Sequence, residues 1–449
     1  MEKKLNTILF FIALLAFPLL YFILPKDKIS VDEKRKLAVV PTLNYNSYIK
    51  GAWADSIDEY VDDHFPLRKK MIDMAVEFQS WKGIILAKQE KVFVSQKKKV
   101  KKRIVTKDST ESKINYLDDF EQAYSGSMLI INGSVYPMGG GSPKMSKKFS
   151  KMVSEYAEEL KGETRVFSAV APLSSAFIPV KKYKHYNYQN KKTLKAIGSS
   201  LTNGAIFCDV FDEMNKHAGE KMYFSTDHHW KPIGAYYAYV AFCKSAGIEP
   251  VPLNKMEKKV KYNFLGSLYQ HTRDLSVKKN PDTMEYYIPK VTTTAVKYTP
   301  YGFDNQTNSK VFYHTSSGGN TYSTFIGGDA PLMRINTSVK NGKKAIVIKN
   351  SYGNAFTVYL ISHYEEIWVV DFRYSKQNLI DIVRKNDIND MIFAIGMYGA
   401  MSNGTIKMMR NLGTQRGVSE PKKSTKNDST EDVEELEDVN SPKDSTSNK

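Results

Sequence analysis

Three polar segments contain residues whose types and spacing could support nucleophilic catalysis. The first, residues 225–230, reads S-T-D-H-H-W and precedes a helix that Pro232 is expected to open. Asp227 and His229 are two residues apart, so in an extended segment both side chains leave the same face, and His228 points to the opposite one. A carboxylate placed in this way can hold an imidazole by its Nδ1–H and stabilise the imidazolium. The pair is therefore a candidate general base with its orienting group.

The same segment has two other interpretations. Its residues could be loop residues that cap the following helix, or Asp227 and both histidines could bind a metal. The metal interpretation is weak, because adjacent ligands on opposite faces rarely converge and the sequence has no H-x-x-x-H spacing here. We predict neither a metal nor a cofactor.

The second segment, residues 345–356, reads A-I-V-I-K-N-S-Y-G-N-A-F and predicts a buried strand that runs into a helix. Ser351 would lie at the strand-to-helix turn with its hydroxyl exposed, followed by backbone N–H groups that point toward a developing oxyanion. Taken alone, the serine is better explained as a helix N-cap. Together with Asp227 and His229 it completes a nucleophile, base and orienter.

The third segment, residues 369–374, reads V-V-D-F-R-Y and ends the next predicted strand. Ligand sites of parallel sheets lie beyond the carboxyl ends of the strands, so Arg373 would face the same crevice as Ser351. An arginine there could grip a carboxylate or phosphate of an anionic substrate. A surface ion pair with Asp371 or a neighbouring residue explains it equally well.

Composition limits the class of protein. The chain has 449 residues, of which 41% are hydrophobic and 25% charged, so it can bury a large core. Its two cysteines, Cys208 and Cys243, exclude a disulfide-dense scaffold and a multi-thiolate zinc module, and we expect buried thiols. The net charge of +17 suits an anionic partner such as nucleic acid, membrane headgroups or an acidic polymer.

The N-terminal part predicts attachment to a membrane. Residues 8–25 carry no charge and would span roughly 27 Å as a helix, so we expect an uncleaved anchor over residues 1–25. Residues 26–113 predict a stem, a helical segment over 56–85 that is interrupted at residues 64–66, and a basic loop at 97–103. The loop lacks the interleaved aromatic residues of a nucleic-acid reader, and we predict no nucleic-acid partner.

Residues 114–415 predict an α/β domain. Strand-like and helix-like runs alternate there, which favours a parallel sheet flanked by helices. Residues 255–340 have a texture of Thr, Tyr, Ser, Gly and Asn that predicts a β-rich insertion, and residues 416–449 predict a disordered acidic tail. The predicted strands are 128–131, 166–170, 205–210, 345–348, 367–370 and 391–395, and the predicted helices 146–160, 233–245, 354–363 and 377–385.

These segments, in this order, resemble the DHHW family of bacterial proteins. That family is similar to the SGNH-like domains of alginate-type polysaccharide O-acetyltransferases. The resemblance spans most of residues 30–400. It includes D-E-K-R-K-L-A-V-V-P at 32–41, Y-V-D-D-H-F-P-L-R at 60–68, F-L-G-S-L at 264–268 and F-I-G-G-D-A-P-L at 325–332.

The resemblance implies a permuted SGNH-hydrolase-like domain with a catalytic triad. Ser351 would be the nucleophile, His229 the general base and Asp227 its orienter. Asn354 and the Ser351 amide would form the oxyanion hole, and Arg373 would bind substrate. The chain departs from the family at one point: Asn350 replaces the aspartate that commonly precedes the serine, which removes a charge beside the nucleophile.

The resemblance also implies an extracytoplasmic, membrane-anchored O-acyltransferase that modifies a cell-surface or exported polysaccharide, with acetyl as the expected group. A multi-span membrane acyltransferase would supply the acyl group. Two alternatives stay open: a carbohydrate esterase with the same triad, and a surface glycan-binding or assembly protein without catalytic activity. The replacement at Asn350 and the basic surface favour the last one slightly.

Overall fold

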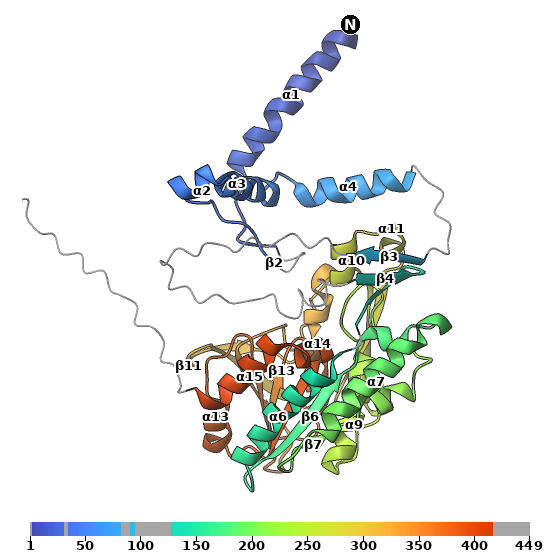
Figure 1. The fold of residues 1–449 in the computed structure, drawn as a ribbon, viewed down its shortest axis with the longest axis vertical. Coiled ribbons are helices and arrows are strands. Elements are labelled where there is room, and N and C mark those ends of the chain that lie inside the picture. Colours follow the sequence, from blue (N-terminus) through green and yellow to red (C-terminus); the bar gives the residue numbers. More distant parts are fainter. Residues whose placement is uncertain (1, 31–34, 82–89, 95–126, 140, 416–449) are drawn as a thin grey trace, which may run out of the picture. The chain divides into compact units, whose positions relative to one another are not determined.

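The computed structural model describes residues 2–30, 35–81, 90–94, 127–139 and 141–415 (Figure 1). The predicted basic loop at 97–103 and the predicted acidic tail at 416–449 lie outside these residues. The segment predicted to cross a membrane forms α1. Within the described ranges, however, no helix is long and apolar enough to span a membrane, so the transmembrane helix that we predicted is not confirmed.

The segment that follows α1 is helical, as predicted. Its helix is interrupted around Pro66, at the predicted position, because a proline disfavours helical backbone in the residue before it. The elements of this part are α1 (Glu2–Ile23), β1 (Ile29–Ser30), β2 (Arg35–Lys36), α2 (Tyr45–Ile49), α3 (Ala52–Asp63) and α4 (Arg68–Trp81).

The main sheet has eight strands in the order β11-β10-β12-β14-β13-β15-β6-β7. The five strands from β14 to β7 are parallel to their neighbours, as predicted. The strands are β6 (Arg165–Ala171), β7 (Ile206–Phe207), β10 (Thr293–Thr299), β11 (Gly302–Ser309), β12 (Leu332–Thr337), β13 (Lys344–Lys349), β14 (Glu366–Asp371) and β15 (Asp390–Gly396).

The predicted parallel sheet accounts for only five of the eight strands, because the predicted β-rich insertion joins the same sheet. Strands β10 to β12 come from the β-rich region and extend the main sheet antiparallel, with β12 paired to β14. The chain turns back directly between β10 and β11, and a connection without a crossover helix allows only antiparallel pairing. The sheet is therefore mixed.

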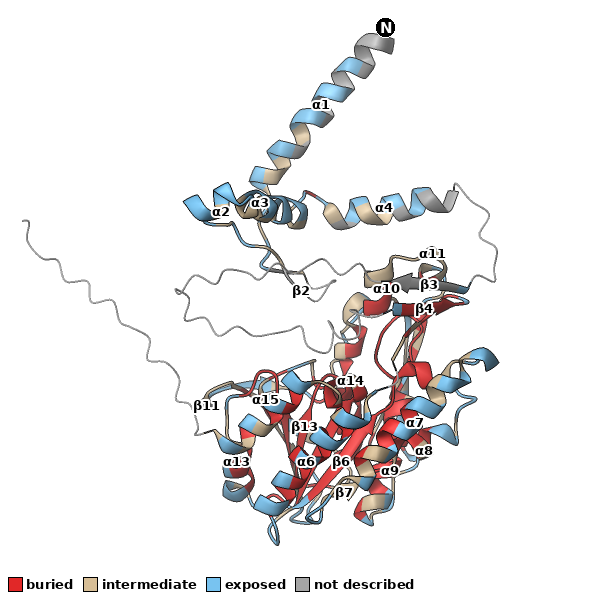
Figure 2. Ribbon diagram, viewed as in Figure 1, coloured by how far each residue is buried: buried red, intermediate tan, exposed pale blue. Residues whose placement is uncertain are grey.

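Helices cover both faces of the main sheet. Along β13, Ala345 and Val347 pack on one side with α9 and α12, whereas Ile346 and Ile348 pack on the other side with α6, α13 and α15. Figure 2 shows the strands buried between these helices. The helices are α6 (Pro143–Glu159), α7 (Lys184–Ser199), α8 (Val210–Asn215), α9 (Pro232–Ala246), α12 (Tyr352–Leu360), α13 (Leu379–Lys385), α14 (Met397–Ala400) and α15 (Asn403–Thr414).

Two predicted strands differ in detail. The strand predicted at 128–131 forms β4, but it belongs to a separate three-stranded antiparallel sheet with β3 and β5. The strand predicted at 205–210 is reduced to β7, because the Asp209 side chain accepts from the Asp212 amide and caps α8. Cys208 and Cys243 are buried free thiols, as expected, and burial raises the pKa of each to about 12.

The remaining short elements lie mainly in the β-rich region. They are β3 (Glu90–Val94), β4 (Ser127–Ile131), β5 (Ser134–Pro137), β8 (Glu257–Phe264), β9 (Asp282–Ile288), α10 (Ser267–Thr272) and α11 (Leu275–Lys278). The 3-10 turns are η1 (Ser174–Phe177), η2 (Lys181–Tyr183), η3 (Leu253–Lys255) and η4 (Gly318–Thr324).

Candidate active site

The fold brings the three predicted triad residues together. His229 Nδ1 lies 2.6 Å from Asp227 Oδ1, and His229 Nε2 lies 2.7 Å from Ser351 Oγ. A carboxylate oxygen only accepts, so Nδ1 donates to Asp227 and Nε2 is the acceptor for the serine hydroxyl. The exposed fractions are 1% for Asp227, 2% for His229 and 8% for Ser351. The arrangement can withdraw a proton from the Ser351 hydroxyl, and Ser351 is the most exposed of the three residues.

Ser351 is placed by the junction of β13 and α12. It occupies the N-cap position, but its side chain makes no capping hydrogen bond. Asn350 takes part of that role, because its Oδ1 accepts from the Tyr352 and Gly396 amides at 3.2 Å each. The serine hydroxyl is therefore directed to His229, and a plain N-cap does not account for its geometry.

The loop that carries Asp227 and His229 is held by a buried carboxylate. Asp282, at the start of β9, accepts from the Ser225 amide at 2.9 Å, and from the Thr226 amide and hydroxyl at 2.8 Å each. An antiparallel bridge between Tyr223 and Trp230 closes the loop. Sequence reasoning missed Asp282, because it lies more than fifty residues away in a stretch without a motif.

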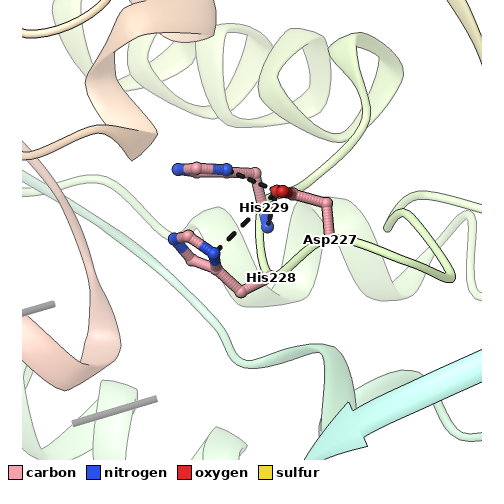
Figure 3. Close-up of side chains that lie close together, drawn as sticks. All are labelled: Asp227, His228 and His229. Carbon is pink, nitrogen blue, oxygen red and sulfur yellow. Dashed lines mark hydrogen bonds and ion pairs between the residues drawn. The ribbon is translucent and has the colours of Figure 1, made fainter. Parts of the chain in front are cut away.

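His228 does not point away from the other two residues, contrary to prediction. Its ring centroid lies 3.8 Å from that of His229. Figure 3 shows the two rings close together beside Asp227. The prediction assumed an extended segment, whereas residues 225–229 form a series of bends. Asp227 Oδ1 accepts from the His229 amide at 3.0 Å, and such an Asx turn removes the strand-like alternation.

The carboxylate of Asp227 is held from its second oxygen as well. Oδ2 accepts from the amide and the hydroxyl of Ser267, each at 2.9 Å. Ser267 belongs to the F-L-G-S-L segment, to which sequence reasoning assigned no role. Both carboxylate oxygens thus receive two hydrogen bonds, which stabilises the negative charge in a buried position.

Asp227, His228 and His229 also form a group with the composition of a metal site. Their ligand atoms lie within 4.8 Å of one another, so the prediction that adjacent ligands would not converge is wrong. The Nδ1 atom of His229, however, is hydrogen-bonded to Asp227, and that of His228 to Ser267. A metal ion would have to break the hydrogen bond that orients His229, so the arrangement suits a proton relay better than a ligand set.

An aromatic ring supports the imidazole of His229 from one side. Tyr322, in η4, stacks on it with centroids 3.8 Å apart and an angle of 8° between the rings. Burial raises the pKa of this tyrosine well above 10, so its side chain stays uncharged where it packs against His229. Sequence reasoning missed this residue, since nothing in its neighbourhood distinguishes it from other tyrosines of the β-rich region.

Asn354 lies in the first turn of α12, one turn after Ser351. Its Nδ2 donates to Asp329 Oδ1 at 3.1 Å, and its Oδ1 is buried without a hydrogen-bond partner in the described part of the chain. The carboxylate fixes the orientation of the amide group, because the reversed amide would place two acceptors together. Nδ2 has a second hydrogen, and its use in an oxyanion hole stays a prediction.

Arg373 is engaged in a buried charge cluster. It forms two hydrogen bonds with Asp371, at 2.9 Å and 2.7 Å, and contacts Asp329 at 2.9 Å. Lys349 Nζ lies 2.9 Å from a carboxylate oxygen of each of the same two aspartates. The ion pair with Asp371 that the sequence left open is therefore present, and a role for Arg373 in substrate binding stays a prediction.

Sequence reasoning assigned no role to Lys349 or Asp329. A lysine that directly follows four apolar strand residues was the available signal for Lys349, because such a position is normally buried. Burial alone would raise the pKa of Asp329, but the charges of Lys349 and Arg373 outweigh it and hold this pKa well below its usual value. The cluster links β13, β14 and the start of α12 beside the nucleophile.

Fold and site together define an α/β protein in which a serine just beyond the carboxyl end of β13 is arranged as a triad with a histidine and an aspartate from the loop before α9. The family model described as DHHW protein matches residues 118–370, more than half of the chain, and the chain therefore belongs to the DHHW family. No curated protein matches the chain.

Two solved structures have a similar fold. A DHHW family protein from Eubacterium siraeum is 31% identical, with a TM-score of 0.58 over 64% of this chain and 94% of that chain. Bacillus cereus PatB1, solved with a sulfonyl adduct, is 17% identical, with a TM-score of 0.52 over 63% of this chain and 98% of that chain. The O-acetyltransferase domain of Pseudomonas putida AlgJ also matches, at 11% identity and a TM-score of 0.32, over 63% and 96% of the two chains.

Proposed function

We propose that this protein is an O-acyltransferase that transfers an acyl group, with acetyl as the expected one, to a cell-surface or exported polysaccharide. The observation that carries the proposal is the unbroken hydrogen-bond chain from Asp227 through His229 to Ser351. Both hydrogen bonds that must carry or stabilise a proton, from Asp227 to His229 and from His229 to Ser351, are already formed.

The chemistry follows the roles of the three residues. Ser351 Oγ attacks the acyl carbonyl carbon while His229 Nε2 takes the hydroxyl proton, and the donor leaves with that proton. A sugar hydroxyl then gives its proton to His229 and attacks the acyl-serine. The resulting tetrahedral intermediate collapses as the bond to Ser351 Oγ breaks, His229 returns the proton to Ser351, and the acylated sugar is released. Asp227 stabilises the imidazolium in both halves of the reaction.

The oxyanion of each tetrahedral intermediate needs donors beside Ser351. We assign this role to the Ser351 amide and to the second N–H of Asn354 Nδ2. Asp329, which accepts the first N–H of Asn354, would keep the amide in the orientation that presents its donor side. Arg373 is assigned to the substrate side of the same region from the family resemblance, and to bind an anionic sugar its guanidinium would have to exchange a contact with Asp371 or Asp329.

The polysaccharide substrate, a location outside the cytoplasm and a multi-span membrane acyltransferase as the acyl source are supported by the resemblance to the acetyltransferases. The net charge of +17 fits an acidic glycan. Membrane attachment stays a prediction of the sequence.

A carbohydrate esterase is the second candidate, and the same triad favours it. The two functions differ in whether water or a sugar hydroxyl reaches the acyl-serine. The non-catalytic alternative drew support from Asn350. The contacts of Asn350 give that residue a role of its own, since its Oδ1 accepts from two backbone amides, as an aspartate oxygen could also do.

An activated-serine probe tests for a working triad. Because PatB1 was solved with a sulfonyl adduct, we would treat the full chain with an aryl sulfonyl fluoride and locate the adduct by mass spectrometry. Labelling of Ser351 is expected in the wild type, in the surface control Ser199→Ala and not in Ser351→Ala. His229→Ala should slow labelling by at least about 10³-fold, in line with removal of a triad base. A folded wild type that stays unlabelled would contradict the proposal.

A second assay separates the two enzymatic functions. The chain is supplied with a chromogenic acetyl ester, with and without an acidic oligosaccharide. Acetylated oligosaccharide in the mass spectrum, dependent on Ser351, supports transfer. Acetate release that the oligosaccharide does not affect supports the esterase instead.

A further inference from the structure

The side chain of Ser267 connects two residues of the D-H-H-W motif. Its Oγ lies 2.9 Å from Asp227 Oδ2 and 2.8 Å from His228 Nδ1. The carboxylate oxygen can only accept, so the hydroxyl hydrogen is directed to Asp227. The serine oxygen must then accept from His228, and His228 must carry its hydrogen on Nδ1.

We propose that His228 and Ser267 are positioning residues that hold Asp227 and through it set the proton affinity of His229. The inference rests on the proposed function, since it assigns a role around the same triad. The hydrogen-bond chain runs from His228 to Ser267 to Asp227 to His229 to Ser351, with Asp227 in the middle. Chains of this kind strengthen each member, because every donor is itself polarised by the next.

The backbone around Ser267 is shaped for this contact. A Cβ on Gly266 would lie 2.3 Å from Asp227 Cβ and 2.4 Å from Oδ2, so a residue without a side chain is needed for the two segments to approach. The Ser267 amide donates to the same oxygen as its hydroxyl. The F-L-G-S-L segment is therefore a cradle for Asp227, formed by Gly266 and Ser267.

His228 is held at its backbone as well. Its carbonyl oxygen accepts from the Tyr352 hydroxyl at 2.6 Å, and Tyr352 directly follows the nucleophile. His228 is 8% exposed, so its ring is held between the cradle and α12. This second histidine thus connects the orienting carboxylate to the helix that carries Ser351.

The direction of the effect on His229 follows from charge. Each hydrogen bond to Asp227 draws negative charge away from His229 and lowers the proton affinity of the Asp227–His229 pair. The other titratable groups against His229 are His228, Tyr322 and Tyr352. Burial holds the pKa of both tyrosines well above 10, so they stay neutral in the assay range.

The direct test is histidine ¹⁵N NMR on the full chain, with the His228 and His229 signals assigned by substitution. We expect the Nδ1–H tautomer for neutral His228 and for neutral His229. In Ser267→Ala the titration midpoint of His229 should rise by about one pH unit, which corresponds to one hydrogen bond to a charged group. Ser267→Thr, which keeps a hydroxyl, should restore it. A His228 Nε2–H tautomer, measured in the wild type and so independent of any variant's folding, would overturn the proposal.

A double-substitution cycle tests whether His228 acts through Ser267. His228→Ala alone should move the His229 midpoint in the same direction, whereas in the Ser267→Ala background it should add nothing. His228→Asn, whose amide can donate from nearly the Nδ1 position, should reverse part of the shift. The surface variants His185→Ala and Ser199→Ala are the matched controls. Additive shifts, or an unchanged midpoint in a folded Ser267→Ala protein, would refute the relay.

Kinetics then separate this inference from the proposed function. If turnover occurs, the acid limb of kcat/KM should move with the NMR midpoint, and kcat/KM measured at pH values well below that midpoint should fall about 10-fold in Ser267→Ala. NMR shifts without any turnover would support the positioning role of His228 and Ser267 and contradict the proposed function. Turnover with no shift in either the NMR midpoint or the acid limb would contradict only the positioning role of His228 and Ser267.

Discussion

The hydroxyl of Ser351 lies 2.7 Å from Nε2 of His229, although the serine occupies a helix N-cap where its side chain would ordinarily bind the helix backbone. One of the backbone N–H groups at the start of this helix, that of Tyr352, instead donates to the side chain of Asn350. Asn350 thus provides a hydrogen-bond acceptor to the start of the helix, and Ser351 contacts the base His229. Ser351 can serve as a nucleophile because its neighbour completes the turn.

This division predicts that the Asn350 side chain matters as an acceptor more than for its missing charge. Asn350→Asp keeps the acceptor and should retain kcat/KM within about 10-fold. Asn350→Leu leaves the Tyr352 and Gly396 amides without that acceptor and should lower the free energy of unfolding by about 2–4 kcal/mol. Urea unfolding and ester turnover measure both. An inactive but stable Asn350→Asp would show instead that the charge at this position decides activity.

Gly266 should be the most sensitive glycine of the site. Gly266→Ala places a methyl group within 2.4 Å of the Asp227 carboxylate, so either the carboxylate or the cradle must move. We expect a loss of about 1–3 kcal/mol in stability, as for overpacking, and at least about 100-fold in turnover. Gly219→Ala is the matched control, because its Cβ meets nothing within 4 Å. Equal behaviour of the two variants would contradict the close packing.

Lys349 should be essential for the stability of the domain. Its side chain is 1% exposed and neutralises Asp329 and Asp371, so Lys349→Met leaves buried negative charge with Arg373 as the remaining partner in the cluster. We expect the free energy of unfolding to fall by about 3–5 kcal/mol. The exposed Lys343→Met should change it by less than about 0.5 kcal/mol. Chemical denaturation measures both, and a loss below about 1 kcal/mol for Lys349→Met would speak against the cluster as a structural centre.

The same cluster predicts a loss of stability in acid. Asp329 has its pKa held well below the ordinary 3.8 by Lys349 and Arg373, against the opposing effect of burial. Below about pH 4 the unfolded chain takes up a proton at this group that the folded chain does not, so the free energy of unfolding falls as the pH decreases. Its contribution is complete above about pH 5.

Denaturation curves between pH 3 and pH 7 test this dependence. The slope of stability with pH should be shallower below pH 4 in Asp329→Asn than in the wild type, because the substituted side chain does not titrate. Asp381→Asn, at an exposed position of α13, serves as the control. A slope that Asp329→Asn leaves unchanged would assign the acid sensitivity to other carboxyl groups.

Local pattern was enough for much of the fold. Four apolar residues before Ser351 predicted β13, and the same reasoning located β14, β15, β6 and the helices α9 and α12. The reason is physical: β13 and α12 are buried on all sides, so each needs a run of mainly apolar residues, and the length of the run and its flanking residues separate strand from helix. The junction that presents Ser351 follows from the same pattern.

Local pattern failed where the chain leaves regular structure. Alternation along a strand predicted that His228 would point away from Asp227, because it assumes an extended backbone, whereas residues 225–229 form bends. It also could not show that β10 to β12 extend the main sheet, since pairing with β14 joins residues far apart in the chain. The first error comes from a local turn that breaks the alternation, and the second from strand pairing between distant residues; local periodicity encodes neither.

The sequence by itself determined which residues can do chemistry here and in what order: an aspartate, a histidine and a serine after a strand. The tertiary structure alone decided how they are held. Asp282 shapes the loop, Ser267 holds the carboxylate and Asp329 holds Asn354. Each is a buried or partly buried polar contact between segments far apart in sequence, and only folding brings its two partners together.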